Sequence, residues 1–140
     1  MIYDPNNIFA KILRGEIPAH KIFEDQHTLA ILDVMPRVEG HCLVIPKAGS
    51  RGLLDADPAM LAHLMVVVQK VAAAAVAANG ADGFQIRQYN EAAGGQAVFH
   101  LHFHILPMKQ GAPLKPAGKM ADPTALAQQA KTIRAEIAKL

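Results

Sequence analysis

The sequence predicts a single α+β domain, in which an antiparallel sheet of about five strands is covered by helices that lie apart from the strands along the chain. Short β-like runs follow one another in hairpin-like succession, and two longer segments carry apolar residues at helical spacing. Strands that are not interleaved one by one with helices favour antiparallel pairing. The chain has 140 residues, enough for one domain with a real core, and no linker divides it.

A short helix is predicted near the amino terminus. Asn6 or Asn7 can cap it, because an asparagine side chain accepts hydrogen bonds from the free N–H groups of the first turn. Gly15 can adopt the left-handed conformation that ends a helix. The residues between them form one apolar face: Ile8, Phe9, Ile12 and Leu13.

Three strands are predicted next. Residues 20–24 and 28–33 are short β-like runs, and residues 25–27 form the turn of a hairpin between them. Residues 41–45 are nearly all apolar and are followed by Pro46, which is typical of a strand in the centre of a sheet.

A long helix is predicted between Asp57 and Gly80. The Asp57 carboxylate can cap free N–H groups, Pro58 suits the first helical position, and Asn79-Gly80 is a helix stop. A broad apolar stripe recurs at helical spacing and requires a sheet or a partner to cover it: Leu61, Leu64, Met65, Val68, Ala72 and Ala75.

Two further strands and a final helix complete the domain. Residues 83–90 and 97–106 are predicted strands, joined by the Gly-rich residues 91–96. A connector rich in Pro, Gly and Lys leads to a helix that starts at Asp122-Pro123 and runs to Leu140. The predicted domain, residues 1–140, thus has its core in residues 7–108 and a carboxyl-terminal connector and helix in residues 109–140.

Composition excludes several classes of protein. Hydrophobic residues make up 51% of the chain and its formal net charge is +2, which argues against disorder and against a dense basic surface for nucleic acid. Cys42 is the single cysteine, so neither an internal disulfide nor a cysteine metal cage can form. The amino terminus does not resemble a secretion signal, and the apolar residues 64–78 are too short and too Ala-rich to span a bilayer. We expect a cytoplasmic protein with a small, locally held anionic ligand and no membrane partner.

Three histidines alternate with apolar residues near the end of the last predicted strand. Side chains alternate along a strand, so His100, His102 and His104 would share one face. The outer two would lie roughly 13 Å apart, so one metal ion cannot bind all three.

Three interpretations of this row remain open. The histidines can simply face solvent, or two of them can bind zinc together with His41 or Asp33. Alternatively the middle histidine is a nucleophile, since neutral imidazole attacks phosphorus without first losing a proton and leaves readily from a phosphorus–nitrogen bond. The preceding Gly94-Gly95-Gln96 permits a tight turn whose N–H groups can approach phosphate oxygens.

The residues from Phe99 to Leu106 resemble the signature of the histidine triad (HIT) family, and Gly94-Gly95-Gln96 is similar to that family's lead-in. The resemblance extends to residues 7–12, 15–18 and 40–47, and covers most of residues 7–108 in the family's order. It implies a HIT-like antiparallel meander with two main helices and a short amino-terminal helix, close to the Hint-like branch, which works as a homodimer.

The resemblance also assigns roles to individual residues. His102 would be the nucleophile that forms a nucleotidyl-histidine intermediate. His100 and His104 would orient it and bind phosphate, and His41 would support the triad. The predicted phosphate ligands are Asn90, Gly95, Gln96 and Ala97. Asp33 would bind the ribose hydroxyls, and the predicted base pocket is formed by Ile8, Phe9, Ile12, Ile31 and Val34.

Two departures from the family pattern qualify the prediction. Many bacterial relatives bind zinc through positions that are Asn7, Ala10 and Gly49 here, so no structural zinc and no required cofactor is predicted. Ala97 stands where the Hint-like branch usually has a serine, which would donate to the leaving group.

The predicted activity is hydrolysis of a purine nucleoside monophosphate derivative, such as an adenosine phosphoramidate, to an AMP-like or GMP-like product. The alternatives are hydrolysis of dinucleoside polyphosphates, nucleotidyl transfer to another phosphate, and a nucleotide-binding sensor with little turnover.

Overall fold

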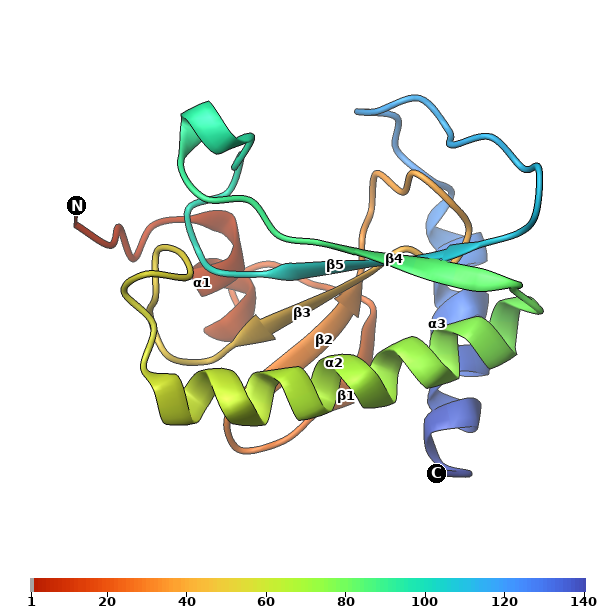
Figure 1. Cartoon of the computed structure of the whole chain (residues 1–140), viewed down its shortest axis with the longest axis horizontal. Helices are drawn as coiled ribbons and strands as arrows, with labels where there is room; N and C mark the ends of the chain where they lie inside the picture. The colour runs from red at the N-terminus through yellow and green to blue at the C-terminus, as the bar shows by residue number, and fades with distance from the viewer. Residues whose placement is uncertain (1) are drawn as a thin grey trace.

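The structure, a computed structural model that describes residues 2–140, is built on a five-stranded antiparallel sheet (Figure 1). Its strands are β1 (Lys21–Glu24), β2 (Thr28–Leu32), β3 (Cys42–Pro46), β4 (Gly83–Arg87) and β5 (Phe103–Met108). The spatial order is β1-β2-β3-β5-β4, and every neighbouring pair is antiparallel. The predicted fold class is therefore confirmed.

The first three strands form the predicted meander, whereas the last two exchange places. After β3 the chain passes through a long helix to β4 at the edge of the sheet and returns along β5, which lies between β3 and β4. β3 pairs only with residues 103–105 of β5, and β4 pairs with residues 104–108. Pro107 is tolerated within β5 because the ladder with β3 has already ended there, so no β3 carbonyl requires its missing N–H.

One face of the sheet is covered by α2 (Pro58–Asn79) and α3 (Pro123–Ile137) (Figure 1). Asp57 accepts from the Met60 N–H at the start of α2, and Gly80 ends the helix in the left-handed conformation, with φ of 57°. Seven residues of α2, from Leu64 to Ala75, are buried against the sheet and α3. By length and composition α2 could cross a membrane, which corrects the expectation that this part of the chain is too short, and 39% of its most apolar window is buried in the core.

The opposite face carries the short helix α1 (Ile8–Leu13), capped by the Asn7 side chain as predicted. Phe9 and Ile12 pack there on Leu29, Ile31, Leu43 and Ile45. The helix covers only part of this face, and the candidate site lies beside it, lined by residues of α1, β2, β3 and β5.

The last predicted strand, residues 97–106, begins later than expected. Residues 97–102 are irregular, and β5 starts only at Phe103. Leu101, Phe103 and Ile105 still point into the core under α2, so the predicted alternation persists through the irregular segment. The alternation persists because of packing. One buried cluster lies on each side of this segment, and successive side chains pack alternately into the two clusters.

Candidate active site

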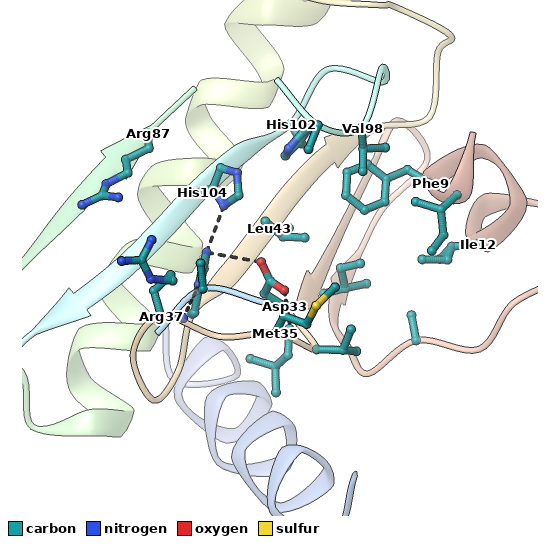
Figure 2. Close-up of a pocket in the computed structure, with 18 of the residues that line it drawn as sticks. Phe9, Ile12, Asp33, Met35, Arg37, Leu43, Arg87, Val98, His102 and His104 are labelled. Carbon is teal, nitrogen blue, oxygen red and sulfur yellow. Dashed lines mark hydrogen bonds and ion pairs between the residues drawn. The ribbon is translucent and has the colours of Figure 1, made fainter. Parts of the chain in front are cut away.

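A pocket of about 470 Å³ opens on the sheet face that α1 leaves uncovered (Figure 2). All five residues predicted for a base pocket line it: Ile8, Phe9, Ile12, Ile31 and Val34. Asp33, His41, His102 and His104 line it as well, so segments far apart in the sequence converge on one cavity. Most of its wall is apolar, and its charged and polar groups include the histidines, Asp33 and two arginines, Arg37 and Arg87 (Figure 2).

The hydrogen bonding of His102 leaves one ring nitrogen free. Its Nδ1 lies 2.7 Å from the carbonyl oxygen of His100. A carbonyl oxygen only accepts, so Nδ1 carries the hydrogen and Nε2 keeps its lone pair. Burial lowers the pKa of His102, which keeps the ring neutral near pH 7, and the ring packs edge-on against Phe9. The predicted nucleophile thus has the protonation state that attack on phosphorus requires.

His100 is fully buried and is not part of the pocket wall. Its Nε2 donates to the carbonyl oxygen of Pro46 over 2.8 Å, so its Nδ1 must accept, and the Tyr3 hydroxyl lies 2.6 Å from Nδ1. The structure therefore does not bring His100 to a phosphate in the pocket. It places His100 behind the nucleophile, where its backbone carbonyl orients His102.

His41 and His104 form a second chain of hydrogen bonds. The backbone N–H of Arg37 donates to His41 Nδ1 over 3.0 Å, so His41 carries its hydrogen on Nε2 and donates it to His104 Nδ1 over 2.9 Å. Burial and the nearby charge of Arg87 lower the pKa of His41 to about 4. Burial, then the neighbouring His102 and His41, lower the pKa of His104 to about 3. Both rings are accordingly neutral at pH 7, and His41, the residue predicted to support the triad, is in direct contact with His104.

Asp33 follows β2 and points toward the histidines (Figure 2). One carboxylate oxygen accepts from the Met35 N–H over 2.9 Å, and the other lies 3.5 Å from His41 Nε2. Burial raises the pKa of this carboxyl group. Its side chain remains 19% exposed, so it can accept hydrogen bonds from a bound diol.

Of the four predicted phosphate ligands, Gly95 and Ala97 line the pocket, whereas Gln96 and Asn90 do not. Both hydrogens of the buried Gln96 amide are used by the carbonyl oxygens of Arg51 and Val98, and its oxygen accepts from the Glu91 N–H. Asn90 is bonded to Leu53 N–H and to the Gln88 side chain. These contacts indicate that Gln96 and Asn90 hold the loop in shape, while Gly95, with φ of +94°, turns the backbone beside the pocket.

Three residues of the site were not singled out from the sequence: Tyr3, Arg37 and Arg87. Tyr3 contacts His100 across 97 positions of sequence, and Arg87 lies opposite His104 in the β4–β5 register. Arg37 lies on the loop after β2, and its own backbone N–H donates to His41. None of the three belongs to a local sequence motif, so their place in the site became visible only in the folded structure.

The zinc ligands of many bacterial relatives have no counterpart among the residues present. Ala10 and Gly49 offer no ligand atom, and a Cβ at Gly49 would come within 2.9 Å of the Tyr3 ring. The Tyr3 hydroxyl also occupies the free Nδ1 of His100. The family's zinc site therefore does not fit this chain.

A different group, Asp33, His41 and His104, places its ligand atoms within 4.8 Å of one another and has the composition of a metal site. Its hydrogen bonding opposes this use. His41 Nδ1 accepts from a backbone N–H, so a metal at Nε2 would have to replace the only hydrogen of that ring. The adjacent arginines add a further unfavourable charge.

Comparison with known proteins agrees with the geometry. Residues 14–111 match the HIT domain. Adenylylsulfatase HINT3 of Arabidopsis thaliana is 42% identical over 103 residues, which is 74% of this chain but only 52% of the plant protein, so the match spans about half of that relative.

Two crystal structures are similar over nearly the whole chain. A HIT-like protein from Bartonella henselae, involved in cell-cycle regulation and crystallised with an unknown ligand, is 48% identical and superposes with a TM-score of 0.93 over 97% of this chain and 99% of the other. A zinc-bound histidine triad family protein from Mycobacterium smegmatis is 35% identical, with a TM-score of 0.84 over 96% of this chain and 94% of the other.

The domain match covers well over half of the chain, and it includes the histidine row and the pocket around it. This protein belongs to the HIT family.

Proposed function

We propose that this protein is a nucleotide-binding hydrolase that cleaves a bond at the α-phosphorus of purine nucleoside monophosphate derivatives through a nucleotidyl-histidine intermediate on His102. One observation carries the proposal: His102 lies in the pocket wall with Nδ1–H bonded to a backbone carbonyl and with Nε2 free. A neutral, oriented imidazole at the end of an apolar pocket is the arrangement that nucleophilic attack needs.

The other residues of the pocket would contact different parts of the substrate. The apolar wall near Phe9 and Ile12 suits a planar base, and Asp33, next along the pocket, suits the ribose hydroxyls (Figure 2). The α-phosphate would then lie against His102, with His104 and the Gly95 turn beside it.

The two steps follow from this placement. His102 Nε2 forms a bond to phosphorus, the bond from phosphorus to the leaving group breaks, and the leaving group retains the electron pair. The ring becomes cationic, and its Nδ1–H bond to the His100 carbonyl stabilises that charge. Water then attacks phosphorus, the P–N bond breaks, Nε2 recovers its electron pair, and a proton is released with the nucleoside monophosphate.

The test uses adenosine 5′-phosphoramidate, a diadenosine polyphosphate and adenylyl sulfate, with excess chelator and no added metal. We expect AMP to be released and an adenylyl adduct to appear in the mass of the quenched protein. His102→Ala should abolish the adduct and lower turnover by a factor of about 10³ or more. His27→Ala, an exposed histidine outside the pocket, is the matched control.

Three results would count against parts of the proposal. Tight AMP binding without product from any substrate would replace hydrolysis with a sensor function, which Ala97 favours by removing a hydroxyl donor from the pocket wall. Loss of activity on chelation would assign a metal role to Asp33, His41 and His104. An adduct that persists in His102→Ala would place the nucleophile elsewhere.

We also propose that the protein is a cytoplasmic homodimer. The support is the exposed apolar side chains on α2 and on the edge strand β4, among which Val66 and Phe84 are 62% and 48% exposed. Such a surface is costly to leave in water and suits a symmetric interface.

A further inference from the structure

Two guanidinium groups line the pocket at the end away from Phe9 and Ile12. Figure 2 shows Arg37 and Arg87 on the far side of His104 from Phe9, beyond the position assigned above to the α-phosphate. They come from different elements: Arg37 from the loop after β2, and Arg87 from the end of β4.

Strand register and hydrogen bonds hold both arginines in place. Arg87 is directly opposite His104 in the antiparallel ladder, which sets their Cβ atoms about 4.5–5.5 Å apart on the same face. The Gln85 side-chain oxygen accepts from both Nε and Nη2 of Arg87, at 3.1 and 2.7 Å. Arg37 Nε donates to the Lys115 carbonyl oxygen over 2.7 Å, which ties it to the carboxyl-terminal connector.

Neither arginine has a carboxylate partner within residues 2–140, although other arginines do. Arg14 pairs with Glu16 and Arg51 pairs with Glu91, whereas Arg37 and Arg87 bond only to neutral oxygens. Two partly buried positive charges beside a largely apolar cavity are unfavourable unless an anion enters it. The part of the pocket beyond the α-phosphate is therefore suited to a negatively charged group.

The chemistry of arginine indicates which leaving group benefits. A guanidinium does not lose its proton near neutral pH, so it stabilises a departing anion but does not protonate a departing amine. His41 and His104 are neutral at pH 7, because their pKa values are about 4 and 3, so neither carries an extra proton to give to a leaving amine. Ala97 supplies no hydroxyl.

We infer that Arg37 and Arg87 form a subsite for an oxyanion leaving group, sulfate or phosphate, joined to the α-phosphorus through an anhydride oxygen. This deepens the proposed function and rests on it. When His102 Nε2 bonds to phosphorus, the bond from phosphorus to the bridging oxygen breaks and its electron pair stays on the leaving sulfate or phosphate, which departs without taking a proton. The preferred substrates are then acid anhydrides of a nucleoside monophosphate, ahead of phosphoramidates.

The kinetic test compares kcat/KM for adenylyl sulfate, a diadenosine polyphosphate and adenosine 5′-phosphoramidate in Arg37→Gln, Arg87→Gln and the wild type. Lys131→Gln removes a positive charge from the exposed surface of α3 and is the matched control. We expect the ratio of anhydride to phosphoramidate kcat/KM to fall about tenfold or more in each arginine variant and to stay unchanged in the control. A larger fall for adenylyl sulfate than for the polyphosphate would identify sulfate as the better occupant, and the reverse would identify phosphate.

A binding test is independent of turnover. In the His102→Ala background, the affinity for adenylyl sulfate relative to AMP should fall by a similar factor when Arg87 is replaced by glutamine. An equal fall for all substrates, or no change in either ratio, would overturn the subsite. Absence of AMP release in the wild type, with the binding difference intact, would instead overturn the hydrolase and leave the subsite standing.

Discussion

At the scale of single residues, the site is defined by the hydrogens on four imidazole rings. Three of the rings, those of His100, His102 and His41, bond a backbone group that can only donate or only accept, which fixes where the hydrogen lies. The fourth ring, His104, accepts from His41, so its hydrogen position is fixed through that ring. His102 therefore carries its hydrogen on Nδ1, and the other three carry theirs on Nε2. The arrangement exposes one lone pair to the pocket, that of His102 Nε2.

The Tyr3 hydroxyl, which lies outside the pocket, bonds the remaining nitrogen of His100. Replacing Tyr3 with phenylalanine removes this hydroxyl and keeps the packing of the ring. Tyr3→Phe would leave His100 Nδ1 buried without a donor, because Phe9 and Tyr3 enclose that ring. We expect the free energy of unfolding to fall by about 1–3 kcal/mol in urea titration. We also expect kcat to fall with little change in KM, since His100 does not line the pocket.

A purely structural role for Tyr3 would give a different result. In that case the stability loss would appear without any change in kcat, and the adduct on His102 would form at the wild-type rate. An unchanged free energy of unfolding would show that the hydroxyl does not satisfy His100.

At the scale of elements, the loop between β4 and β5 carries backbone strain beside the pocket. Glu91 is the one non-glycine residue with positive φ among the described residues, at φ 63° and ψ 164°, a region that favours glycine. The loop is held closed by Gln96, which bonds to Glu91 N–H and to the Arg51 carbonyl, and by the ion pair of Arg51 with Glu91.

Glu91→Gly should therefore stabilise the protein. Glycine relieves strain of about 1–3 kcal/mol, and loss of the half-buried, bidentate ion pair with Arg51 offsets part of that gain. We expect a net gain of about 1 kcal/mol in the free energy of unfolding. Glu91→Gln keeps the strain and removes only the charge, so it should change stability slightly. If Glu91→Gly instead unfolds more easily than Glu91→Gln, the strain assignment is wrong.

At the scale of the whole molecule, β4 is an edge strand with apolar residues on the α2 side of the sheet. Phe84 and Ile86 are 48% and 43% exposed, and Met65 and Val66 on α2 are exposed as well. Unpaired edges of this kind invite pairing with another chain. This surface supports the homodimer proposed above.

Ile86→Lys should convert that dimer to a monomer, because a lysine ammonium would be buried in the interface without a partner. Sedimentation velocity measures the outcome. Leu140→Lys, at the carboxyl terminus, where the leucine is 66% exposed against 43% for Ile86, should remain dimeric. A wild-type monomer, or a dimer in both variants, would show that this face is not the interface.

The buried histidines also make the stability of the whole fold depend on pH. The folded state lowers the pKa of His41, His100, His102 and His104, so below about pH 6.5 the unfolded chain binds more protons than the folded one. Stability should hold above about pH 7 and fall on acidification, by at most about 1.4 kcal/mol per pH unit for each histidine. The raised pKa of Asp33 has the opposite effect, because the folded state then binds a proton more tightly than the unfolded chain and gains stability at low pH. The comparison is therefore made above about pH 5.5, where this contribution is small.

Urea titrations across this range test the dependence in the wild type and in His41→Asn, whose amide oxygen can accept from the Arg37 N–H as His41 Nδ1 does. The slope of stability against pH should be smaller in His41→Asn and unchanged in His27→Asn, an exposed control. Equal slopes in all three proteins would show that His41 does not contribute.

Much of this fold could be predicted because its signals are local. Asp57 with Pro58, and Asn79 with Gly80, mark both ends of α2 to within a residue. The hairpin of β1 and β2 and the apolar strand β3 were recognisable from composition and turns. The start of β5 was predicted six residues early, because alternation continues through the irregular residues 97–102.

The sequence alone determined the chemistry of this protein: three histidines in alternation, a glycine turn before them, and the family to which they belong. Only the tertiary structure decided which residues surround the histidines and which hydrogen bonds they make. It placed Tyr3 on His100, placed Arg87 across from His104, and used the Gln96 amide to close a loop. The physical reason is that hydrogen bonding, burial and strand register depend on partners distant in the chain, whereas caps, turns and alternation depend on neighbours.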